Sequence, residues 1–427
     1  MNVAQGAMTA RDEWKTGWTV VFAGFMGMFF FSVLFGSMSV FMGPLTEEFG
    51  WSRTLVSAGM SISSVFTAIL SPFFGILIDK FGSRKVALPG VIVTAVATAA
   101  IGLASGSSAQ WLLLWSVYAV VSLSAGTTVW TAAVAGVFDK AQGLAIGFAL
   151  AGATAAHAVM PPLANYLIDT IGWRMAFAWL GLGWGAVAFV ITWFLFYDVH
   201  DGRGVGTRGV KRESTGNAQF PGLTISEAWK SRALWSIGIS IIIIMMMSIG
   251  LFFHQIEILI GTGVDRTNAA WLASLAGGMG IVGKLITGIL LDRYRGSLVG
   301  GITMSTTAIA FALLIYGTQS TALLVVAMMV NGYTAGAKLQ IGSYLTVRYC
   351  GMKNFGKIYG FMSSLVGIGS GLGPIVAGMI FDMSGNYTAF LIAGAVGMLL
   401  SSMLLITLPR YPQWRREEEP VGEPALA

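Results

Sequence analysis

The sequence predicts an all-α membrane protein whose twelve transmembrane helices form two six-helix halves. Three observations predict this fold: an apolar composition, twelve long apolar segments, and a repeat that relates the two halves. Hydrophobic residues make up 55% of the 427 residues, charged residues only 10%, and mean hydropathy is +0.75. Soluble domains carry about 25% charged residues. The chain is therefore expected to lie within a lipid bilayer, and its net charge of +6 reflects orientation in the membrane rather than binding of nucleic acid.

Each of the twelve apolar segments is long enough to cross the bilayer as a helix, which takes roughly 20 residues. Transmembrane β-strands would appear instead as short segments of alternating hydrophobicity, whereas these segments are long and continuous. Their approximate cores are 18–42, 54–78, 86–105, 110–136, 142–167, 173–197, 233–259, 268–291, 298–318, 321–347, 355–381 and 387–408.

The longest polar break, residues 198–231, separates a first half (1–197) from a second half (232–409), and residues 410–427 form a polar tail. Within this linker, residues 223–229 are compatible with a short helix on the membrane surface or with plain linker. No cleavable signal peptide is expected, because the first residues are polar and the first apolar segment is too long. The single Cys350 excludes a disulfide within the chain.

Basic residues predict the orientation of the chain. With both termini in the cytoplasm, twenty of the 25 Lys and Arg residues lie in cytoplasmic segments, and only Arg53, Arg174 and Arg266 lie in outer ones. Cytoplasmic loops of membrane proteins carry an excess of Lys and Arg. The remaining two, Lys284 and Lys338, lie inside apolar segments. The short loops favour a bacterial inner membrane.

The two halves repeat each other without a gap at an offset of 213 residues. The matched residues are mainly Gly, Pro and Asp: Gly50, Arg53 and Thr54 with Gly263, Arg266 and Thr267; Gly75 and Asp79 with Gly288 and Asp292; Gly143 and Gly147 with Gly356 and Gly360; Pro161 and Asp169 with Pro374 and Asp382; Gly172 and Phe177 with Gly385 and Phe390. Such parallel repeats are typical of secondary transporters, which bind substrate near the midplane between the halves.

Residues 75–85, GILIDKFGSRK, lie between the second and third segments and resemble the signature loop of the major facilitator superfamily. The resemblance implies that this loop and its repeat clamp the cytoplasmic side in one conformation. The residues it assigns to this cytoplasmic gate are Gly75, Asp79, Lys80, Arg84, Asp292 and Arg293. Gly75 allows close helix approach, as small residues do in membranes. The plain alternative is an ordinary charged turn.

Residues 138–152, FDKAQGLAIGFALAG, resemble the fifth-helix signature of the monocarboxylate transporter family, from whose usual basic pair Ala141 and Gln142 depart. Residues 15–18, KTGW, echo that family's first-helix motif. The sequence also resembles the oxalate:formate antiporter-like carriers, which belong to the same branch of the superfamily. It implies a carrier of small organic anions.

Lys284 is the first candidate for binding substrate. A lysine at membrane depth costs about 2.5–3.5 kcal/mol on insertion scales and is a functional hypothesis by default. In the resembled carriers an arginine at this place binds the substrate carboxylate; a lysine supplies charge without the bidentate fork. The neighbouring Gly277, Gly280 and Gly288 leave room for a ligand or for a close helix.

Lys338, in the tenth segment, is the second candidate, with Asn331 on the same helical face. Two cations without a buried acidic partner invite a dianion or a ligand with separated negative groups. The alternatives are that Lys338 extends to the surface or that Glu257 neutralises one lysine.

His254 is proposed for both substrate binding and proton coupling, because histidine binds anions and exchanges protons near neutral pH. Bacterial members of the monocarboxylate transporter family, which this sequence resembles, have a histidine in the seventh span that faces the cation of the eighth span. Glu257 is the second candidate for proton coupling, since the acid that the family carries in span eight is replaced by Gly280. Tyr118 and Tyr333 are expected to line the cavity; His157 receives less weight.

These features predict a secondary active transporter of mono- or dicarboxylates that works by alternating access as a monomer, with proton symport. Anion exchange and facilitated diffusion stay open, and a drug/proton antiporter of the same fold is the less favoured reading, because such exporters place acids in the membrane. An enzyme or a sensor is disfavoured, because the sequence shows no metal-ligand cluster, phosphate loop or Ser/His/Asp set. No cofactor or metal is expected.

Overall fold

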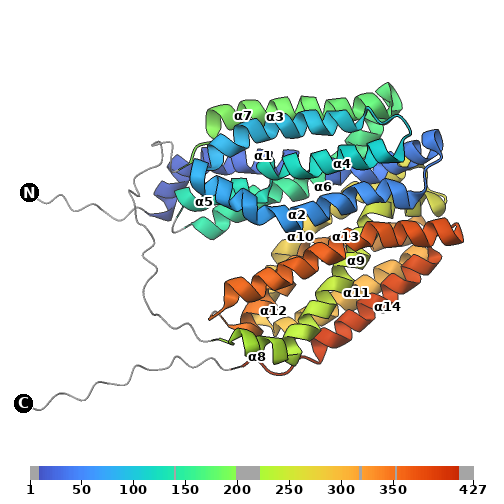
Figure 1. The fold of residues 1–427 in the computed structure, drawn as a ribbon. Coiled ribbons are helices and arrows are strands. Elements are labelled where there is room, and N and C mark those ends of the chain that lie inside the picture. Colours follow the sequence, from blue (N-terminus) through green and yellow to red (C-terminus); the bar gives the residue numbers. More distant parts are fainter. Residues whose placement is uncertain (1–8, 139–140, 199–221, 317–319, 352, 413–427) are drawn as a thin grey trace, which may run out of the picture.

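A computed structural model describes residues 9–138, 141–198, 222–316, 320–351 and 353–412, except for the side chains at positions 79, 355 and 356. Its helices fall into two groups, coloured blue to green and yellow-green to red in Figure 1. The first group comprises α1 (Ala10–Phe49), α2 (Arg53–Phe81), α3 (Ser83–Ile101), α4 (Ser108–Ser122), α5 (Thr127–Val137), α6 (Gln142–Ala178) and α7 (Trp184–Leu195), with short turns η1 (Leu123–Ala125) and η2 (Trp179–Gly183). The second comprises α8 (Ile225–Lys230), α9 (Arg232–Gly261), α10 (Arg266–Arg293), α11 (Gly296–Ile315), α12 (Thr321–Cys350), α13 (Phe355–Ser384) and α14 (Thr388–Ile406).

The described helices account for twelve membrane crossings. Eleven helical stretches of the described chain are long and apolar enough to cross a membrane, and one of them, Gln142–Leu195, has 54 residues. At 1.5 Å per residue that stretch would measure about 80 Å, more than twice the ~30 Å hydrocarbon core. It contains a break at Gly172, where φ is 79°. The stretch therefore crosses twice, and the predicted twelve-helix fold is confirmed.

Positive φ angles explain two of the repeated glycine pairs. Gly50 and Gly263 have φ of 63° and 94°, and Gly172 and Gly385 have φ of 79° and 72°. Only glycine adopts this region without steric cost. The pairs end helices or break them at equivalent points, so the same turn geometry recurs in both halves.

The linker enters the second half through α8. Thr224 caps this helix and exchanges hydrogen bonds with Glu227, and these bonds lower the pKa of the Glu227 carboxyl. The Leu223 N–H donates to the Cys350 carbonyl, 2.9 Å away. The segment after Pro221 therefore forms a short capped helix. We call the side where α1 begins and α8 lies the linker side, and the opposite side the distal side (Figure 1).

The two halves pack through α2 against α13 and through α6 against α10. Along the first pair, a Cβ on Gly378 would meet Thr54, one on Gly371 would meet Ser61 and Ser64, and one on Gly367 would meet Ala68. Thr54 and Gly378 lie towards the distal side, whereas Gly75 and Gly360 lie towards the linker side and have nothing within 4 Å of a Cβ. These helices therefore touch distally and part towards the linker side.

The second pair behaves in the same way. A Cβ on Gly277 of α10 would meet the His157 backbone of α6, and Gly280 faces Thr154. Further towards the linker side, Gly143 and Gly147 of α6 face open space. The parting is therefore common to both seams between the halves.

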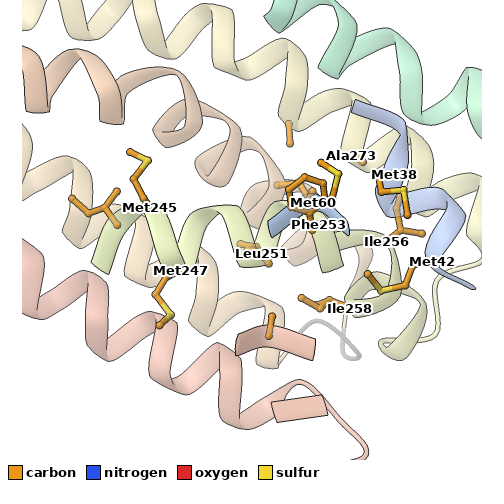
Figure 2. Close-up of a cluster of buried hydrophobic side chains, with 14 of the residues drawn as sticks. Met38, Met42, Met60, Met245, Met247, Leu251, Phe253, Ile256, Ile258 and Ala273 are labelled. Atoms are coloured by element: carbon orange, nitrogen blue, oxygen red, sulfur yellow. The ribbon is translucent and has the colours of Figure 1, made fainter. Parts of the chain in front are cut away.

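A methionine-rich apolar cluster closes the contact between the halves (Figure 2). Met38 and Met42 of α1 and Met60 of α2 gather with Phe253 and Ile256 of α9, all of them buried in one core cluster. Methionine is flexible and fills irregular gaps. Apolar packing that is rich in methionine is suited to helices that move against each other.

Candidate functional site

Close backbone packing of α10 against α12 positions the two intramembrane lysines. A Cβ on Gly336 would lie 2.0 Å from the Gly280 carbonyl oxygen, and one on Gly283 would lie 2.1 Å from the Tyr333 carbonyl oxygen. No side chain fits at such distances. The glycines near Lys284 therefore admit a close helix rather than a ligand, and they bring Lys284 of α10 near Lys338 of α12.

The tightness of this contact leads to a stability prediction. Gly336→Ala should lower the stability of the folded protein by about 1–3 kcal/mol, the usual cost of overpacking, because its Cβ meets backbone rather than a flexible side chain. Thermal unfolding in detergent measures the effect. Gly278→Ala in α10 is the control, since nothing lies within 4 Å of its Cβ and it should unfold no earlier than the parent. Equal unfolding temperatures for the two variants would contradict the packing.

The lysines converge on α6 of the first half. Lys284 is exposed, and its Nζ donates to Thr154 Oγ1 at 2.8 Å. Lys338 is 8% exposed and makes no hydrogen bond or ion pair with the described residues. Both ammonium groups interact electrostatically with His157, whose ring lies 5.0 Å from that of Phe252. A ligand between them would face two cations, an imidazole and a hydroxyl group.

Two alternatives for these lysines do not hold in this structure. Lys338 is buried rather than extended to the surface. Glu257 pairs with Arg53, at 2.7 Å, rather than with a lysine. Among the described residues, no carboxylate lies within ion-pair distance of Lys284 or Lys338. The centre of the molecule therefore carries uncompensated positive charge.

A second polar cluster, the distal gate, joins the halves on the distal side; we define it as Arg53, Thr54, Glu257, Asp382 and Tyr387. The Arg53 guanidinium donates to Glu257 Oε2 and to Tyr387 Oη, both at 2.7 Å, and lies over the Phe381 ring at 3.5 Å. Asp382 accepts from the N–H groups of Arg53 and Thr54, at 3.0 Å each, and from the Thr54 hydroxyl. One arginine of the first half thus contacts three parts of the second.

His254 lies beside the distal gate, and we call the gate and this histidine together the distal cluster. Its Nε2 lies 3.0 Å from the Pro374 carbonyl and from Ser57 Oγ, and its Nδ1 lies 2.6 Å from Tyr387 Oη. A carbonyl only accepts, so Nε2 carries the proton and Nδ1 accepts from Tyr387. A tyrosine hydroxyl keeps its proton near neutral pH, so Tyr387 can donate to Nδ1. His254 is thereby neutral, with both nitrogens engaged.

The structure therefore separates residues that the sequence grouped together. His254 lies in the distal cluster, whereas His157, which received less weight, lies beside the lysines. Asn331 is buried on α12, 5% exposed. Tyr118 is buried in an aromatic row with Trp111 and Trp115. Tyr333 accepts a hydrogen bond from Thr287, 3.2 Å away, and lines a groove between α10, α11 and α12.

Sequence reasoning did not assign Thr154 to the substrate or Arg53 to a gate. The repeat carried a signal for Arg53, because it matches Arg266, and both make contacts between the halves. Arg266 donates to the Val40 carbonyl at 2.6 Å. Thr154 had no such signal, because a threonine in an Ala- and Gly-rich helix is unremarkable on its own.

The residues expected to clamp the cytoplasmic side lie on the linker side. Lys80 is exposed beside the Phe81 ring, and Asp292 and Arg293 are exposed at the end of α10. Arg84 donates to the Trp193 carbonyl of its own half at 2.8 Å. The Asp79 side chain lies outside the described residues.

Comparison with known proteins supports the fold and the kind of protein. A model described as Major Facilitator Superfamily matches residues 20–262 and 255–427. Monocarboxylate transporter 13 of Bos taurus is 27% identical over 409 residues, covering 92% of this chain and 90% of the relative. Monocarboxylate transporter 4 of Mus musculus is 26% identical over 430 residues, covering 96% and 86%. These matches agree with the resemblance drawn from residues 75–85 and 138–152.

Two further comparisons broaden the picture. Multidrug resistance protein MdtG of Dickeya zeae is 23% identical over 418 residues, covering 94% of this chain and 97% of the relative. The crystal structure of a bacterial homolog to the human lysosomal transporter Spinster, inward-facing and unoccupied, matches with a TM-score of 0.66 at 17% identity, covering 93% of this chain and 96% of that one. At this identity the structure supports the fold alone.

Proposed function

Because the chain belongs to the Major Facilitator Superfamily, we propose that it is a secondary transporter of small organic anions, mono- or dicarboxylates, that works by alternating access. It is a transport protein of the membrane, not an enzyme. The observation that carries the proposal is the lysine pair, Lys284 and Lys338, which has no carboxylate partner among the described residues. Lys338 is buried, and a buried charge is unfavourable without a partner. A carboxylate substrate supplies that partner.

The proposed orientation places the linker side in the cytoplasm. It follows from the distribution of Lys and Arg. On this orientation the described conformation is open inwards and closed outwards by the distal gate. The short loops support a bacterial inner membrane as the proposed location.

Alternating access then requires the parting to move from the linker side to the distal side. The repeat suggests which residues would meet. Seven residues separate Ala68 from Gly75 along α2, and seven separate Gly367 from Gly360 along α13, so continuing the Ala68–Gly367 contact brings Gly75 to Gly360. The repeat-related pair is Gly147 with Gly288. These four glycines would let the helices close on the linker side.

Proton coupling is proposed for Glu257. In the closed distal gate its charge is balanced by Arg53, 2.7 Å away, and attracted by Arg266, whereas Glu47 repels it. Opening the gate would carry Arg53 away with the first half and leave Glu257 without its nearest cation. Losing a nearby cation favours the protonated form of a carboxylate. His254 and Tyr387 would relay the change, because both touch the same cluster.

The proposal is tested in proteoliposomes that hold a trapped pH dye, with formate, lactate, oxalate and succinate added outside one at a time. Acidification above that of protein-free vesicles is expected for the transported acids. Glu257→Gln should abolish acidification while labelled substrate still exchanges across the membrane, because the amide keeps the shape and cannot titrate. Acidification by this variant at the parent rate would refute the role of Glu257.

A drug/proton antiporter is the second candidate, because MdtG is named a multidrug resistance protein. The lysine pair disfavours it, since organic cations would be repelled. Ethidium transport without any transport of the acids would favour this candidate instead. Acid exchange without acidification would indicate an anion exchanger.

A further inference from the structure

A large groove on the flank of the second half has no part in the proposed transport path. It is a cavity of about 860 Å³ between α10, α11 and α12. We call it the lateral groove, and define it by Tyr294, Arg295, Leu298, Ile302, Thr306 and Tyr333 among its lining residues. Ile302 and Tyr294 are 61% and 62% exposed, so the groove opens to the outside of the helix bundle.

The wall of the lateral groove presents mainly apolar side chains to an occupant. Thr303 and Thr306 donate to carbonyls of their own helix, those of Val299 and Thr303, both at 2.8 Å. Tyr333 is bonded to Thr287. Because the Thr303 and Thr306 donors are used within their own helix and most of the other lining side chains are apolar, we expect the body of an occupant to be hydrocarbon.

The mouth of the groove on the linker side is different, because it carries the Arg295 guanidinium. Two of its bonds go to the Leu408 and Pro409 carbonyls, at 2.5 and 2.6 Å, while its buried Nε has no partner in the described chain. No carboxylate of the described residues pairs with it. Tyr294 and Arg293 lie beside it, both exposed. The mouth therefore offers the positive charge of Arg295 at the end of an apolar channel.

We propose that the lateral groove binds one anionic phospholipid, with an acyl chain along α11 and its phosphate at Arg295. Basic pockets between transmembrane helices near a membrane surface recognise anionic lipid headgroups. From Leu298 to Thr306 the groove follows α11 for eight residues, about 12 Å, and at Met279 and Val326 it continues beyond them. This length suits a chain rather than a headgroup alone.

The repeat explains why the groove lies here. A smaller cavity of about 360 Å³ in the first half is lined by Leu77, Phe81, Lys85 and Pro89 among others. These positions correspond to Leu290, Tyr294, Leu298 and Ile302 in the lateral groove. The fold thus forms a groove at the same place in both halves, and the second half has enlarged it and added Arg295.

The test compares phosphatidylglycerol, which is anionic, with phosphatidylcholine, which is zwitterionic, by native mass spectrometry and thermal unfolding of the full-length protein. We expect phosphatidylglycerol to bind about fivefold more tightly, the effect of one basic side chain near an anionic lipid. Ile302→Trp should fill the groove and abolish this binding. Ile309→Trp is the matched control, because Ile309 lies on the same helix, is 56% exposed and does not line the groove.

Arg295→Gln should equalise binding of the two lipids, and the tryptophan pair still decides the question if that variant unfolds. Equal binding of both lipids by the parent protein would overturn the proposal. So would equal effects of the two tryptophans, which would indicate general lipid contact. Stabilisation by glycerol 1-phosphate as strong as that by phosphatidylglycerol would overturn it too, because a free phosphate would then suffice.

Discussion

Lys338→Met and Lys284→Met should each lower carboxylate uptake by roughly 30-fold or more while the protein still folds. Removing one partner of a buried charge pair costs about 2–5 kcal/mol, and every 1.4 kcal/mol is a factor of ten. Lys338→Met should also raise the unfolding temperature of the empty protein, because it removes a buried charge that has no partner in the described chain. Uptake of the acids identified with the pH dye, together with thermal unfolding, measures both effects.

The control is Lys353→Met, which alters an exposed lysine outside the lysine pair and should leave uptake unchanged. Dicarboxylates separate the roles of the two lysines. If Lys338 binds a second carboxylate, Lys338→Met should impair dicarboxylate uptake more than monocarboxylate uptake. Near-normal uptake by both methionine variants would rule out the lysine pair as the anion site.

Gly75→Cys combined with Gly360→Cys should form a disulfide that stops transport and is reversed by a reducing agent. The single native Cys350 is first replaced by serine, so that only the introduced cysteines react. In the described conformation nothing lies within 4 Å of a Cβ at either glycine, whereas a disulfide needs Cβ atoms about 3.5–4.5 Å apart. Crosslinking therefore requires closure of the linker side.

Ser64→Cys with Gly371→Cys is the matched control. A Cβ on Gly371 would lie 3.6 Å from that of Ser64, so this pair should crosslink without any change of conformation. Addition of a transported acid should speed the Gly75–Gly360 reaction and leave the control rate unchanged. A Gly75–Gly360 pair that never crosslinks, while the control does, would contradict closure by these glycines.

The sequence predicted the fold well because membrane spanning constrains it strongly. Twenty apolar residues in a row have few alternatives in a bilayer, and the glycines at positions 50, 172, 263 and 385 marked turns that need positive φ. Depth along a helix was also predictable, which is why Lys284 and Lys338 were found. The short helix α8 was left open, since six residues carry too little periodicity to distinguish a helix from a linker.

The site was predicted less completely because depth says little about which helix a side chain faces. His254 lies in the distal cluster through Tyr387 and Pro374, which are more than 100 residues away in the chain. Glu257 is balanced by Arg53, from the other half. In the sequence, the glycines beside Lys284 could leave room for a ligand or allow a neighbouring helix to pack closely. The packing of α10 on α12 shows that they allow a helix to pack closely.

The unequal use of a repeated backbone has an evolutionary consequence. After a duplication, neither copy can change freely at the four repeat-matched glycines with positive φ, because an added Cβ strains the turn. Elsewhere the copies are free to diverge: Lys284 corresponds to Ser71 and Lys338 to Ala125. One copy carries the two lysines, and the other places Thr154 and His157 opposite them. New ligand preferences can arise by substitution in one copy, without any redesign of the hinges that both copies share.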